Sequence, residues 1–119
     1  MGADLKKMYS IELPVNLKEY RPTDPENFGL TIRVEAGPVG SDAADLFDVF
    51  VCTPNWIKER CTQEGAIWGR HMLLMPEYDY NLIQQAVTRR MAACQGKDWH
   101  EVANKLARFA AWEFEDYQP

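Results

Sequence analysis

The sequence lacks the features that mark several large classes of protein. No apolar run approaches the length of a membrane span, and the first ten residues hold no apolar segment that could serve as a signal peptide. There is no glycine-rich phosphate loop, no paired-histidine zinc motif and no nucleophile elbow. We therefore expect a cytoplasmic protein that does not bind a membrane and that uses neither a cofactor nor a metal ion.

Cysteine is scarce, occurring only as Cys52, Cys61 and Cys94. An odd number of cysteines without metal-ligand spacing predicts neither a disulfide framework nor a zinc site. We expect three reduced thiols and no intramolecular disulfide. The 119 residues form one domain, residues 1–119, and a domain of this size buries about two thirds of its unfolded surface, so its core needs no cross-link.

Basic residues are fewer than acidic residues in this sequence. Lysine and arginine number 13 against 18 aspartate and glutamate residues, which gives a formal net charge of −5. An acidic chain is a poor candidate for direct binding to nucleic acid, because phosphates attract basic surfaces, and it suits a basic protein partner.

Period-two alternation of apolar and polar residues predicts four strands. The clearest example alternates Phe28, Leu30, Ile32 and Val34 with polar residues, which is typical of a sheet that has one face in water. A polar, proline-containing loop is expected at residues 16–27. The strands are expected at residues 5–13, 28–36, 46–52 and 66–75.

Three helices are predicted from their start signals. Thr53 followed by Pro54 suits the start of a short helix that Gly65 ends, and Asp79 suits the start of a helix over residues 80–95. Asp98 and Glu101 have the spacing of a capping box, which predicts a third helix over residues 99–112. Its core face would carry Val102, Ala103, Leu106, Phe109 and Ala110.

These elements predict an α+β fold in the order βββαβαα. We expect an antiparallel sheet of about four strands, with the two long C-terminal helices and the short helix packed mainly on one face. That face would carry Leu30, Ile32 and Val34. The short helix between the third and fourth strands is long enough to permit a crossover, so these two strands can pair in either direction.

The end of the chain mixes large rings with carboxylates. Trp112 and Phe114 alternate with Glu113, Glu115 and Asp116, so some of the rings should be half exposed. Two interpretations fit this pattern. The rings can close the core beneath a solvated acidic fringe, or they can anchor a partner that the carboxylates steer. The acidic residues Asp45 and Asp48 are second candidates for such a binding surface.

Several separated motifs occur together in the order of one known family. They are Pro25-Glu26-Asn27-Phe28-Gly29, Phe47-Asp48-Val49, Val51-Cys52-Thr53-Pro54 with Trp56, Gly69-Arg70-His71, Asp98-Trp99 with Val102-Ala103 and Leu106, and the segment from Trp112 to Tyr117. In these motifs the chain resembles the immunity protein 8 family of bacterial polymorphic toxin and contact-dependent growth inhibition systems. The chain departs from the family pattern at Met72, where a polar residue is expected, and at Ala107, where serine is commoner.

The resemblance implies an α+β fold and a protein that binds a cognate toxin C-terminal domain delivered between competing cells. With the acidic composition, it predicts stoichiometric inhibition of a basic nuclease through Glu113, Glu115, Asp116, Trp112, Phe114, Asp45 and Asp48. The family motifs are not catalytic, so no catalytic residue is expected. Two alternatives are a small hydrolase or ligand-binding enzyme using Arg70, His71 and a carboxylate, and a structural subunit without a toxin partner.

Overall fold

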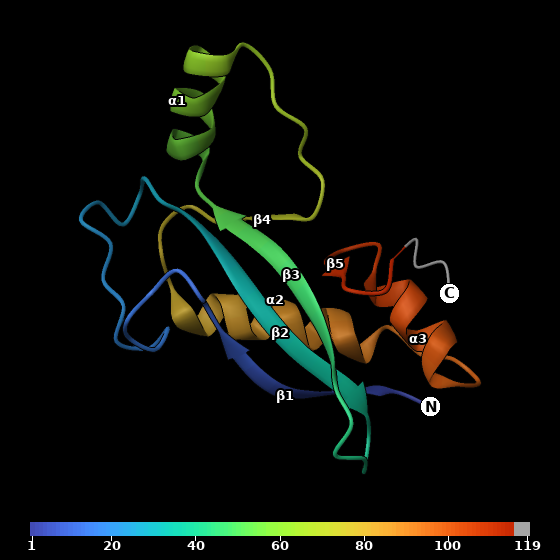
Figure 1. Ribbon diagram of the computed structural model, residues 1–119. Coiled ribbons are helices and arrows are strands. Elements are labelled where there is room, and N and C mark those ends of the chain that lie inside the picture. Colours follow the sequence, from blue (N-terminus) through green and yellow to red (C-terminus); the bar gives the residue numbers. More distant parts are fainter. Residues whose placement is uncertain (116–119) are drawn as a thin grey trace.

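The computed structural model describes residues 1–115 and forms five strands and three helices within them (Figure 1). The strands are β1 (Ala3–Tyr9), β2 (Gly29–Pro38), β3 (Asp45–Cys52), β4 (Met72–Leu74) and β5 (Ala111–Trp112). The helices are α1 (Pro54–Glu64), α2 (Tyr80–Ala92) and α3 (Trp99–Leu106). The predicted α+β class and order of elements are confirmed, with β5 as an additional short strand.

The sheet is mixed rather than purely antiparallel. Its order is β1-β2-β3-β4; β1, β2 and β3 pair antiparallel, whereas β4 runs parallel to β3. The parallel pair is possible because α1 and the loop after it carry the chain back before β4 begins. β5 also pairs with β3, antiparallel, at Phe47 and Asp48. β4 and β5 therefore share one edge of β3.

The core lies between the sheet and the two C-terminal helices, as predicted, but the short helix α1, expected on the same face, contributes no buried residue to it. Leu30, Ile32 and Val34 on β2 are buried, while Thr31, Arg33 and Glu35 alternate with them on the other face. In Figure 1, α2 runs across one side of the sheet. Helix residues in the same buried cluster are Ile83, Met91, Val102, Ala103 and Leu106.

All three helices begin where their capping residues predicted. The Thr53 hydroxyl accepts a hydrogen bond from the Trp56 amide at 3.4 Å, and Asp98 accepts one from the Glu101 amide at 2.9 Å. Asp79 accepts bonds from the amides of residues 81 and 82. Each bond joins neighbours in sequence, so the helix starts are fixed locally.

The ends of several elements differ from the prediction. β1 stops at Tyr9 because the chain turns at Ser10, whose hydroxyl accepts a bond from the Glu12 amide at 3.2 Å; Ile11 is consequently exposed. α2 stops at Ala92 and is capped by residue 93 instead of reaching residue 95. The fourth strand shrinks to three residues, because residues 66–71 form a loop.

The largest difference is at the end of α3, which stops at Leu106 instead of residue 112. The amides of Phe109 and Ala110 both bond to the Leu106 carbonyl, so the chain tightens into a turn. Phe109, predicted to belong to the core, is 39% exposed beside α2, where the Arg90 guanidinium lies 3.9 Å from its ring centre. The turn sends residues 111 and 112 back to the sheet as β5.

Candidate functional site

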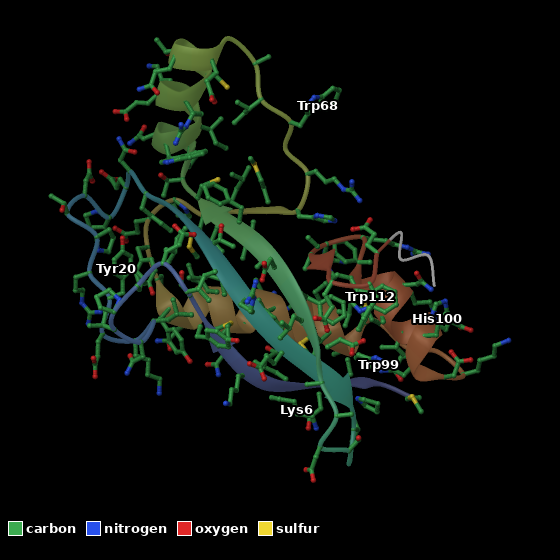
Figure 2. All side chains as sticks on the ribbon, in the orientation of Figure 1. Lys6, Tyr20, Trp68, Trp99, His100 and Trp112 are labelled. Carbon is green, nitrogen blue, oxygen red and sulfur yellow. The ribbon has the colours of Figure 1, made fainter. Side chains whose placement is uncertain are left out.

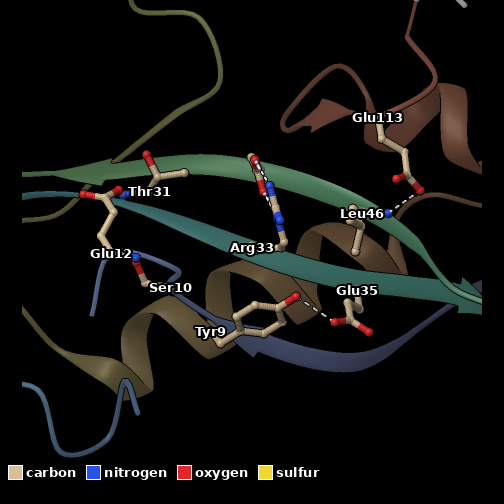
Figure 3. A network of polar contacts seen from close by, with 9 residues as sticks. Tyr9, Ser10, Glu12, Thr31, Arg33, Glu35, Leu46 and Glu113 are labelled. Carbon is tan, nitrogen blue, oxygen red and sulfur yellow. Dashed lines mark hydrogen bonds and ion pairs between the residues drawn. The ribbon is translucent and has the colours of Figure 1, made fainter. Parts of the chain in front are cut away.

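The C-terminal segment is fastened to the start of β3. The Glu113 amide donates to the Leu46 carbonyl at 3.1 Å. The Leu46 amide in turn donates to the Glu113 carboxylate at 3.0 Å (Figure 3). Glu113 thus pairs with an edge of β3 that would otherwise present open backbone groups. We call the surface formed by Glu113, Phe114 and Glu115, together with Asp45 and Trp112 beneath it, the C-terminal edge.

Asp45 holds this edge in place through two tryptophans. One of its oxygens accepts hydrogen bonds from the indole N–H of Trp99 at 2.9 Å and of Trp112 at 3.1 Å. An indole N–H can only donate, so a buried tryptophan needs such an acceptor. Asp45 therefore joins the beginning of α3 and strand β5 to the beginning of β3.

The two rings of the C-terminal edge differ in exposure. Trp112 is only 9% exposed and stacks against Phe47, with 6.2 Å between the ring centres. The prediction of a half-exposed ring is therefore wrong for Trp112, which β5 turns toward the core. It is confirmed for Phe114, which is 44% exposed and meets Trp112 edge to face at 5.9 Å.

Asp48 lies on the other face of the sheet. It accepts two hydrogen bonds from Arg33, at 2.9 and 3.1 Å, and this pairing raises the pKa of the Arg33 guanidinium (Figure 3). On the same face the Tyr9 hydroxyl donates to Glu35 at 2.8 Å, a bond that raises the pKa of the Tyr9 phenol. The structure thus brings Asp45, but not Asp48, together with Trp112. Asp116 lies outside the described residues.

Arg70 connects the loop before β4 to the C-terminal edge, and His71 connects it to the end of α3. Arg70 forms an ion pair with Glu115, and His71 Nε2 lies 2.9 Å from the Ala107 carbonyl oxygen. His71 has φ 57°, a left-handed conformation that residues other than glycine seldom adopt. Its carbonyl accepts a bond from the Phe50 amide at 2.9 Å, so contacts on both sides hold this strained residue.

A hollow of about 500 Å³ lies between this loop and the C-terminal edge. It brings together both histidines of the chain, which the sequence placed on different elements. The hollow is lined by residues that include Arg70, His71, His100, Arg108, Phe114 and Glu115.

The hollow contains an arginine, a histidine and a carboxylate, the three kinds of side chain that the enzyme alternative requires. Arg70 is paired with Glu115, however, and His71 contacts a backbone carbonyl. These contacts fasten two segments together. Among residues 1–115 no three His, Cys, Asp or Glu side chains are grouped so that they could hold a metal ion.

A comparison with protein families decides the identity of the chain. The model of the family described as immunity protein 8 matches residues 3–117, nearly the whole sequence. The chain belongs to the immunity protein 8 family. No curated protein and no solved structure matches it. As a member of this family, the protein is an immunity protein for a toxin, in keeping with the resemblance carried by its motifs.

The structure of this immunity protein also reveals a residue that the sequence pattern misplaced. Trp68, expected within a strand, lies on the loop between α1 and β4 and is 93% exposed. Gly65 and Gly69 flank it, and two glycines so close together are more typical of a loop than of a strand.

Within residues 1–115, no helix has the combination of length and apolar character that crossing a bilayer requires.

Proposed function

We propose that this immunity protein neutralises its cognate toxin C-terminal domain by one-to-one binding and that the toxin is a basic nuclease. The observation that carries the proposal is the family match over residues 3–117 in a chain of net charge −5. A nuclease that grips phosphates presents a basic surface, and an acidic inhibitor is attracted to it from a distance.

The C-terminal edge is the surface we assign to this contact. Glu113 and Phe114 are exposed, and Glu115, the next residue, is partly exposed and paired with Arg70. Asp116 would extend the acidic run. An aromatic anchor surrounded by carboxylates supplies apolar contact area together with steering charge.

Asp45 and Trp112 have a supporting role in this proposal. Their hydrogen bond, and the bond from Leu46 to Glu113, fix the segment against β3 before the partner arrives. A surface that is already ordered loses less entropy on binding. Asp48 belongs to the opposite sheet face, where it can add to the long-range field.

The test removes charge while keeping hydrogen bonds. In the double variant Glu113→Gln, Glu115→Gln, the amide oxygens can still accept bonds from Leu46 and Arg70. We expect association with the toxin domain to slow by about tenfold at low salt and to depend less on salt, because two steering charges are gone. Stopped-flow fluorescence at several salt concentrations measures both effects.

The matched control is Glu19→Gln, Glu26→Gln, which removes the same charge from the exposed loop between β1 and β2. This control should associate nearly as fast as the wild type. Equal slowing in both double variants would show that only net charge matters and that the C-terminal edge is the wrong surface. Failure of the wild type to bind the toxin domain encoded beside it, or to block its nuclease activity at a one-to-one ratio, would refute the function itself.

A further inference from the structure

α1 and the loop after it form an arm, residues 54–71, of which α1 stands away from the sheet and the end of the loop returns to it (Figure 1). α1 contains no buried residue, which is unusual for a helix of a small domain. The arm is attached at its root, where the Trp56 ring lies 4.8 Å from that of Phe50. A Cβ on Gly29 would come within 2.5 Å of Trp56, so only glycine allows this close approach.

Trp68 lies beyond this root with its side chain in solvent (Figure 2). At 93% exposure it is the most exposed of the large hydrophobic side chains among residues 1–115. Water solvates a large aromatic ring poorly, and tryptophan is enriched among the residues that dominate protein interfaces. The fold itself leaves this ring uncovered, so the ring is available to a partner.

The arm differs in charge from the rest of the molecule. It holds the cations Lys58, Arg60 and Arg70 and the anions Glu59 and Glu64, so three positive minus two negative charges give +1. The whole chain carries −5, which leaves −6 on the other residues. The arm therefore contributes little to the long-range attraction of a basic partner.

The arm is continuous with the C-terminal edge. Arg70, two residues after Trp68, forms the ion pair with Glu115, and both residues line the hollow of about 500 Å³. Trp68 and Phe114 thus belong to segments that meet at Arg70 and Glu115. A single partner surface can reach both rings.

We propose that Trp68 is a second anchor for the toxin domain and inserts into an apolar recess beside the toxin's basic surface. A projecting arm fits a concave partner surface, and the exposed indole of Trp68 fits an apolar recess in that surface. This inference rests on the proposed function. It adds an apolar contact to the charged one at the C-terminal edge. The carboxylates govern the rate of association with the toxin, and Trp68 governs the rate of dissociation.

The test compares Trp68→Ala with Trp68→Phe and with Val39→Ala, which truncates a 68% exposed side chain in the β2–β3 turn. We expect Trp68→Ala to weaken binding by about thirtyfold or more, as for an interface hot spot, through faster dissociation at every salt concentration. Trp68→Phe should keep most of the affinity, and Val39→Ala should equal the wild type. Melting temperatures should not change.

Acrylamide quenching gives an independent measure. The difference in emission between the wild type and Trp68→Phe isolates Trp68, which should be strongly quenched in the free protein and protected in the complex. If the wild type binds the toxin and Trp68→Ala binds within about threefold of it, the arm is not an anchor, although the proposed function stands. Absence of wild-type binding overturns both. A wild-type dimer that Trp68→Ala dissociates would assign the ring to self-association and overturn the inference.

Discussion

At the scale of single residues, some buried or partly buried polar groups of this protein join segments that are distant in the sequence. Asp45 serves two indoles, and Thr53, which is fully buried, accepts bonds from the amides of both Phe28 and Trp56. Among residues 1–115 no buried side-chain nitrogen or oxygen lacks a hydrogen-bond partner. A buried polar group without a partner would cost about 1–3 kcal/mol, so these pairings are conditions for the fold.

The cysteines give a prediction at this scale. All three are free thiols; Cys52 and Cys94 are buried, and Cys61 is partly exposed. Burial raises the pKa of Cys52 from 9.0 to about 11 and also raises the pKa of Cys94, because the thiolate would lose its hydration. At pH 8 a disulfide reagent should therefore modify only Cys61 rapidly, as counted by absorbance.

In denaturant all three thiols should react, and Cys61→Ser should abolish the fast phase. Fast reaction of two or three thiols in the folded protein would contradict the burial.

The raised pKa of Cys52 also makes the stability of the fold depend on pH. Between pH 9 and about 11 the thiol of Cys52 ionises in the unfolded chain but not in the folded one, so its contribution to stability is lost as the pH rises.

At the scale of elements, α3 is held by its apolar face and by its two ends. Val102, Ala103 and Leu106 are buried against the sheet, while Asp98 caps the first turn. The last turn is followed at once by the tightened segment that leads to β5. The helix therefore positions the C-terminal edge, and its packing controls the site indirectly.

Leu106→Ala tests this packing. Leu106 is 7% exposed, and truncation of a buried leucine costs roughly 2–5 kcal/mol of the free energy of unfolding. Phe109→Ala is the matched comparison, since the sequence places both residues on the same helix face but Phe109 is 39% exposed. Urea denaturation should give a clearly smaller loss for Phe109→Ala. A loss below about 1 kcal/mol for Leu106→Ala would mean that Leu106 is not part of the core, and equal losses would mean that Phe109 stabilises the fold as much as Leu106 does.

At the scale of the whole molecule, the segments that stabilise the fold differ from the segment to which we assign partner binding. The core joins β2, β3, α2 and α3, whereas α1 contributes no buried residue. Segments with few buried apolar contacts open at a lower free energy than the core. The arm that we assign to partner binding thus begins with the helix that buries the fewest residues.

Hydrogen exchange measured by mass spectrometry should show this difference. Amides of α1 should exchange much faster than those of α2 around Ile83 and Met91, which are buried. The two helices are similar in length, at 11 and 13 residues, so length alone would not separate them. Equal protection of α1 and α2 would show that α1 unfolds only with the core.

The sequence by itself determined the features that depend on neighbouring residues. Helix starts at Thr53, Asp79 and Asp98 follow from side chains that bond amides two or three positions away. The two faces of β2 follow from strict alternation, because successive side chains of a strand point to opposite sides. The family resemblance was also readable, since its motifs keep their order along the chain, and the family match confirms it.

Only the tertiary structure decided which distant segments meet. Asp45 receives the indoles of Trp99 and Trp112 from 54 and 67 positions away, and no local pattern encodes that pairing. The same contacts end α3 early, create β5 and bury Trp112. Trp68 shows the converse case: an apolar residue in an apolar stretch becomes exposed, because periodicity shows which residues could be buried but not whether a neighbour exists to cover them.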